Sequence, residues 1–159
     1  MIRPALIGAG LAGPAHPVLA IGVAGVFATL AGLHVAWALS GRSAGALVPA
    51  RADGAPLFRP SRGLTLLIAL ALAAAAALVL GRVGLLPTPA GADPARWDRG
   101  YRAGTWALGA VLALRVVGDF RYVGLCKRER GTRFATLDTR VYTPCCALLA
   151  AGVFALAAG

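Results

Sequence analysis

One uninterrupted apolar run restricts what this chain can fold into more than any other feature. Between Arg62 and Arg82 the sequence reads GLTLLIALALAAAAALVLG, nineteen residues without a charge. At about 1.5 Å of rise per residue, a helix of this length approaches the roughly 30 Å thickness of a bilayer's hydrocarbon core. Such a run is typical of a transmembrane helix, and we therefore expect an integral membrane protein.

The composition of the whole chain supports the same class. Of its 159 residues, 58% are hydrophobic and 14% are charged, with a mean hydropathy of +0.74, whereas soluble domains carry about 25% charged residues. We expect a single membrane domain over residues 1–159. The net charge of +10 would suit nucleic acid, but the cations lie between apolar runs. Anionic lipid headgroups are therefore the expected counter-charges, and nucleic-acid binding is not expected.

The charge-free runs predict an all-α protein, a bundle of four transmembrane helices. The second span is predicted at 63–82 and the fourth at 142–158, with Thr143 as its N-cap and Pro144 as its first helical residue. A third is predicted at 101–119.

The first span is less sharply bounded. Pro14 and Pro17 interrupt the first apolar stretch, which predicts a span over 18–40 and an interfacial segment over 1–17. A cleaved signal peptide is the alternative interpretation of the N-terminal segment, but its apolar part before Pro14 is short.

The third span predicts a charge at membrane depth. Only twelve residues separate Arg102 from Arg115, which is about 18 Å of helix against about 30 Å of hydrocarbon. The helix must therefore continue past Arg115. Because Asp119 follows four residues later, we expect the two side chains to share a helix face and to form an ion pair.

The distribution of cations predicts the orientation. The loops between spans one and two and between spans three and four hold ten Arg or Lys residues, and the opposite side holds five. The positive-inside rule then places both loops in the cytoplasm and both termini outside, in a multi-pass protein of the inner (cytoplasmic) membrane.

In this orientation, polar residues of separate spans share one depth near the cytoplasmic leaflet. We interpret them either as a structural latch or as a ligand pocket. The candidate ligand-binding residues are His34, Trp37, Arg115, Asp119, Arg121, Tyr122 and Tyr142. Four cations of the following loop are candidate contacts of anionic lipid, namely Lys127, Arg128, Arg130 and Arg133.

The sequence contains no pattern typical of a metal or redox site. Two His and three Cys are scattered without ligand spacing, and we interpret Cys126, Cys145 and Cys146 as small apolar residues. Which cofactor the protein uses, if any, is unknown from the sequence.

A stripe of small residues on span one offers a helix-packing surface. Ala24, Ala28, Gly32 and Ala36 recur every four positions, and His34 falls almost opposite them at 100° per residue. Because an imidazole in lipid is costly, we expect His34 to face the bundle and the stripe to pack elsewhere. A homodimer through the stripe is one consequence, and packing against span two is the alternative.

The segment GDFRYVGLCKRERGTRFATLDTRVYTP, together with LHVAWALSG upstream, resembles an uncharacterised bacterial family of small four-span membrane proteins, a domain of unknown function. The resemblance extends from span one to span four. It implies a four-span integral membrane protein and implies no activity, cofactor or site. The family often has an aromatic pair where this chain has Leu125 and Cys126, which argues against a functional role for Cys126.

Two functions remain open on the residues alone. The first is a non-enzymatic bundle that binds lipid or a membrane partner through the polar cluster at the cytoplasmic leaflet. The alternative is a membrane enzyme acting on a lipid or quinone-like substrate, with His34 as acid or base beside Arg115. A coupled transporter is disfavoured because Asp119, at the edge of its span, is the only candidate carboxylate relay.

Overall fold

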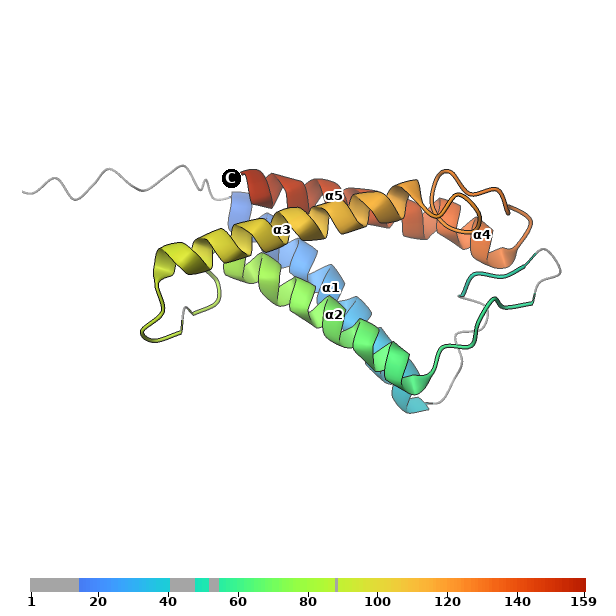
Figure 1. Ribbon diagram of the computed structural model, residues 1–159, viewed down its shortest axis with the longest axis horizontal. Coiled ribbons are helices and arrows are strands. Elements are labelled where there is room, and N and C mark those ends of the chain that lie inside the picture. Colours follow the sequence, from blue (N-terminus) through green and yellow to red (C-terminus); the bar gives the residue numbers. More distant parts are fainter. Residues whose placement is uncertain (1–14, 41–47, 52–54, 88) are drawn as a thin grey trace, which may run out of the picture.

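The computed structural model describes residues 15–40, 48–51, 55–87 and 89–159 (Figure 1). Its helices are α1 (Ala15–Ser40), α2 (Arg62–Arg82), α3 (Pro94–Val117), α4 (Arg133–Leu137), the π-helical turn η2 (Asp138–Tyr142) and α5 (Thr143–Ala158). Within the described ranges the only β pairing is one bridge between Ala50 and Pro56. The all-α prediction is therefore confirmed. The interfacial segment predicted over 1–17 lies outside the described residues, apart from its last three.

Three helices are long and apolar enough to cross a membrane: His16–Ser40, Arg62–Arg82 and Arg133–Ala158. By their length and composition, these three helices fit the expectation of a membrane protein. Helix α3 is also long, but charged residues occupy its first turns and Arg115 its last turn. That α3 forms the third span of a four-span bundle remains a prediction.

Helix α3 begins seven residues earlier than the span predicted at 101–119, and it ends two residues earlier. Asp93 caps it, because its carboxylate accepts a hydrogen bond from the Ala95 N–H at 3.0 Å, and Pro94 occupies the first turn. Gly118 ends the helix with a φ of 93°, a value that glycine adopts without strain. The polar start of α3 therefore extends beyond the apolar part that a membrane span requires.

The last helix also begins earlier than the predicted 142–158. Thr132 is its N-cap and accepts a hydrogen bond from the Ala135 N–H at 3.1 Å. The helix then continues through η2 into α5, so the prediction of Thr143 as the N-cap was wrong. Pro144 cannot donate to the carbonyl four residues before it, and the widened π turn that precedes it accommodates the break in the hydrogen-bond ladder.

The helices form two pairs that meet at one end and diverge toward the other (Figure 1). Helix α1 packs along α2 and α3 packs along α5, whereas no Cα atom of α1 lies within 8 Å of one in α3, so these two helices do not pack closely on each other. The shared core lies where the pairs meet, and it combines side chains of α1, α2 and α5 such as Phe27, Val79 and Leu156. At the C-terminal end of α2, where the pairs meet, Arg82 pairs with Asp98 of α3 at 3.6 Å.

Glycines let α3 approach its two neighbours closely. A side chain at Gly81 of α2 would collide with the ring of Tyr101, and one at Gly104 would lie 2.8 Å from Leu78. On the other side of α3, a side chain at Gly109 would lie 2.6 Å from the Phe154 ring. Helix α3 is therefore seated between α2 and α5 through contacts that only glycine permits.

The small-residue stripe of α1 is mostly uncovered. Ala24 is buried in the core, but Ala28, Gly32 and Ala36 are exposed, and a side chain at Gly32 would meet nothing within 4 Å. His34, on the other face, is half-buried. Three of the four residues of the stripe are thus left uncovered by α2. The homodimer through it remains a prediction.

Candidate functional site

A buried carboxylate organises the end of the molecule where the two helix pairs diverge. Asp138 has no exposed surface and lies in the first turn of η2. One of its oxygens accepts a hydrogen bond from Arg115 Nη2 at 2.5 Å, and the other accepts one from Lys127 Nζ at 2.9 Å. The same oxygen accepts bonds from the Gly124 N–H at 2.9 Å and the Thr143 hydroxyl at 3.3 Å. We call Arg115, Lys127 and Asp138 the charge cluster.

The charge cluster corrects the predicted ion pair. Arg115 does pair at this depth, but with Asp138 and not with Asp119. Helix α3 ends at Val117, so Asp119 is no longer on the helix and the four-residue spacing does not apply. A second guanidinium nitrogen, Arg115 Nη1, is buried and has no partner among the described residues.

Asp119 instead closes a tight turn. Its carboxylate accepts hydrogen bonds from the backbone N–H groups of Arg121, Tyr122 and Val123 at 2.9, 2.6 and 2.9 Å. The carboxylate is thus a structural acceptor for the turn.

Two glycines make the turn possible. Gly118 and Gly124 have φ values of 93° and 82°, and a side chain on either would collide with the backbone of the opposite strand of the turn. The N–H of Leu125 donates to the Val116 carbonyl at 2.8 Å, which brings the chain back alongside α3. The Gly124 N–H then donates a hydrogen bond to Asp138, which connects the backbone of the turn to the charge cluster.

Lys127 does not lie where the sequence reasoning expected it. Its side chain is 4% exposed, and its ammonium group is used by Asp138 and the Gly124 carbonyl. The prediction of Lys127 as a lipid contact was therefore wrong in this structure. The other three predicted lipid contacts, Arg128, Arg130 and Arg133, are exposed.

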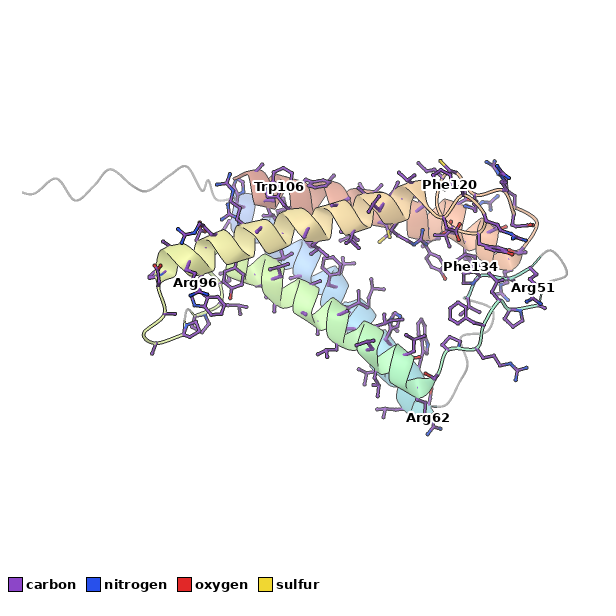
Figure 2. All side chains as sticks on the ribbon, viewed as in Figure 1. Arg51, Arg62, Arg96, Trp106, Phe120 and Phe134 are labelled. Carbon is purple, nitrogen blue, oxygen red and sulfur yellow. The ribbon has the colours of Figure 1, made fainter. Side chains whose placement is uncertain are left out.

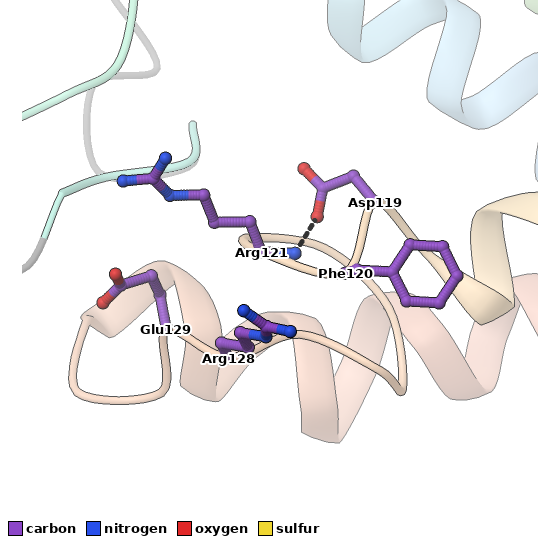
Figure 3. A pocket seen from close by; sticks show the side chains of 5 residues that line it. All are labelled: Asp119, Phe120, Arg121, Arg128 and Glu129. Atoms are coloured by element: carbon purple, nitrogen blue, oxygen red, sulfur yellow. Dashed lines mark hydrogen bonds between the residues drawn. The ribbon is translucent and has the colours of Figure 1, made fainter.

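An open pocket of about 450 Å³ lies on the outer side of the turn. Figure 3 shows its five lining residues, which are Asp119, Phe120, Arg121, Arg128 and Glu129. Two guanidinium groups and two carboxylates line it, and one carboxylate, that of Asp119, is already engaged with the backbone. The Arg121 guanidinium also lies 5.1 Å from the ring centroid of Tyr122.

The remaining predicted site residues lie in two separate places. Tyr142 is in η2, half-buried, with its ring 6.0 Å from that of Phe134. Figure 2 shows Phe134 at the same end of the molecule as Phe120. His34 and Trp37 lie on α1 with ring centroids 5.1 Å apart, and His34 Nδ1 lies 2.8 Å from the Leu30 carbonyl. His34 is on α1 and Arg115 is on α3, and these helices do not pack closely on each other. The structure therefore does not bring His34 beside Arg115.

The sequence reasoning missed Asp138, the residue at the centre of the charge cluster. Its signal was present, because residues 127–140 hold five cations and only two acidic residues, and Asp138 is the one nearer to span four. Gly118 and Gly124 were also missed, although two glycines bracketing a short polar segment are typical of a tight turn. Among the residues that the structure describes, no group of three His, Cys, Asp or Glu side chains is placed to hold a metal ion.

The comparisons with known proteins identify the family. The family model described as Protein of unknown function (DUF3995) matches residues 27–153, about four-fifths of the chain. The match includes the whole charge cluster, the turn over residues 118–126 and the stretch that holds the exposed arginines, residues 121–140, which we call the basic segment. No curated protein and no solved structure matches the chain. The expected membership in a family of unknown function is therefore confirmed: the chain belongs to the DUF3995 family.

Proposed function

We propose that the chain is a non-enzymatic four-span protein of the bacterial inner membrane, with both termini outside, whose cytoplasmic face binds anionic phospholipid headgroups. The observation that carries this proposal is a set of exposed arginines on a segment held in one conformation. The exposed members are Arg121, Arg128, Arg130, Arg133 and Arg140.

The conformation of this segment favours lipid binding over the alternative that its cations serve only to orient the protein in the membrane. Asp138 ties the segment to α3 through Arg115 and to the loop itself through Lys127. Cations on a preorganised backbone lose less conformational entropy when they bind a headgroup than cations on an unstructured loop. Each is worth about 1 kcal/mol near an anionic surface. Because Lys127 is paired with Asp138, the exposed arginines are the cations of this segment that can contact lipid.

The test compares two sets of three arginines at opposite ends of α3. Arg128, Arg130 and Arg133 are changed to Gln in one variant, and Arg96, Arg99 and Arg102 in a matched control. Native mass spectrometry of protein released from nanodiscs of mixed phosphatidylglycerol and phosphatidylcholine then measures the retained lipid. We expect the wild type to retain phosphatidylglycerol preferentially, and the first variant to lose up to about a hundredfold in that preference.

Two results would contradict the proposal. Equal losses in both variants would indicate a general effect of charge that does not depend on the structured segment. A wild type without preference for phosphatidylglycerol would also exclude headgroup binding, and it would leave a partner membrane protein as the ligand of this face.

A further inference from the structure

The turn Gly118–Cys126 pairs nearly all of its backbone N–H groups within the protein. Eight of its nine N–H groups donate a hydrogen bond within the protein, Phe120 being the exception among these described residues. The acceptors, in chain order, are oxygens of Leu114, Val123, Asp119 (three times), Asp138, Val116 and Val117. Non-helical backbone is costly in hydrocarbon mainly because its polar groups are unpaired. For its N–H groups this turn has largely avoided that cost, and the carbonyls of Arg121, Val123 and Gly124 also accept hydrogen bonds.

Two large apolar side chains nevertheless project from the turn without covering each other or the core. Phe120 is 61% exposed and Leu125 is 63% exposed. Phe120 also has a φ of 63°, a left-handed conformation that is rare for a bulky residue and that Gly or Asn would adopt more easily. In Figure 3 its ring points away from Arg121, toward the side where α3 enters the turn. In water, no burial of the phenyl ring would offset the free-energy cost of this left-handed backbone conformation.

The length of α3 supplies an independent reason for apolar side chains here. Its apolar part from Ala103 to Val117 holds fifteen residues with one charge, which is about 22 Å of helix. The hydrocarbon core is about 30 Å thick. If α3 crosses the membrane, the residues that follow Val117 therefore lie at the edge of the hydrocarbon rather than in bulk water.

We propose that the turn Gly118–Cys126 is immersed in the cytoplasmic leaflet, with Phe120 and Leu125 inserted among the phospholipid acyl chains just below the headgroups. The turn completes the short span of α3, and the arginines beside it stand at headgroup level. This inference rests on the four-span arrangement of the proposed function. It does not depend on a preference for anionic lipid.

The experiment measures depth by spin labelling in nanodiscs of phosphatidylcholine alone. Single cysteines replace Phe120, Leu125, Leu114 and Arg128 in a chain whose native cysteines are changed to Ala. Leu114, which is 69% exposed on α3, is the reference for hydrocarbon, and Arg128 is the reference for the headgroup level, where the nickel chelate has access. Each label's collision rates with oxygen and with a water-soluble nickel chelate are compared. A melting curve of each labelled protein checks that it is folded.

We expect labels at Phe120 and Leu125 to favour oxygen over nickel several-fold more than the label at Arg128, as the label at Leu114 does. Labels at Phe120 and Leu125 that collide with nickel as readily as the Arg128 label, while Leu114 remains in hydrocarbon, would overturn this inference alone. Nickel access at Leu114 as well would show that α3 does not cross the membrane. It would overturn the proposed function together with this inference.

Discussion

At the scale of single residues, Asp138 determines the local structure more than any other side chain. It is fully buried and receives hydrogen bonds from α3, from the turn and from α5. Sequence spacing favoured Asp119 as the partner of Arg115 because residues four apart share a helix face. The helix stops two residues before Asp119, and the actual partner is twenty-three residues away. Local spacing could predict that Arg115 is paired, but not with which residue.

The Arg115–Asp138 pair is expected to show strong thermodynamic coupling. Removing one member of a buried ion pair costs roughly 3–5 kcal/mol, because the other charge is left without compensation. Arg115 is 30% exposed, so Arg115→Met should lie below that range, and Asp138→Asn should lie within it. The double variant should cost at least about 1 kcal/mol less than the sum of the single variants. The measurement is a double-mutant cycle on unfolding in detergent.

A parallel cycle with Asp119→Asn provides the control. Asp119 makes no ion pair with Arg115, so this cycle should be additive within about 0.5 kcal/mol. Stronger coupling of Arg115 to Asp119 than to Asp138 would contradict the charge cluster.

The two glycines of the turn should not tolerate even a methyl group. Gly118→Ala and Gly124→Ala each place a side chain against backbone at a left-handed φ, which should cost about 1–3 kcal/mol or more. Gly131→Ala is the matched control, because a side chain there would meet nothing within 4 Å. Thermal unfolding in detergent measures the cost. Equal melting temperatures for all three variants would show that the turn is not closed as described.

At the scale of the helices, the sequence predicted the apolar elements well and the polar ends poorly. Helix α2 differs from its predicted bounds by one residue, because charges bracket its apolar run. Helix α3 and the last helix begin well before their predicted spans. Charged residues lie in or just after their first turns, so charge-free runs do not include them, although Asp93 and Thr132 are ordinary N-caps that a capping analysis could have found.

The close packing of α3 on α5 is expected to depend on Gly109. Gly109→Val would force a side chain into the Phe154 ring, and overpacking of this kind typically costs about 1–3 kcal/mol. Gly100→Val, in the same helix, introduces the same side chain where nothing lies within 4 Å. The two variants are compared by melting temperature in detergent. A loss confined to Gly100→Val, or equal losses in both, would contradict the packing of α3 on α5.

At the scale of the whole molecule, sequence reasoning could predict a common depth for residues of separate spans, but it could not predict which of them lie side by side. His34 and Arg115 were expected in one cluster because both lie near the cytoplasmic ends of their spans. The structure puts them on α1 and α3, which do not pack closely on each other. The two helix pairs diverge toward the end of the molecule that holds the charge cluster (Figure 1). Which helices pair is decided by contacts between distant segments, such as Gly109 with Phe154, and no periodicity within one helix reports them.

The native cysteines are expected to be dispensable. All three are free thiols, with Cys126 exposed and Cys145 and Cys146 half-buried. Changing them together to Ala should therefore leave the melting temperature in detergent within a few degrees of the wild type, since surface and small-volume changes typically cost little. Loss of folded protein in the triple variant would instead indicate a role for a thiol.

Whether α3 crosses the membrane, with the basic segment on the cytoplasmic side, is tested most directly by cysteine accessibility. In the cysteine-free chain, single cysteines at Ala92, Ala55 and Gly131 are treated in intact cells with a maleimide that does not cross membranes. We predict that only the cysteine at Ala92 is labelled, and that Ala55 and Gly131 react only after the cells are opened. Labelling of Ala92 and Gly131 from the same side would contradict a four-span protein, and the reverse pattern would contradict its orientation.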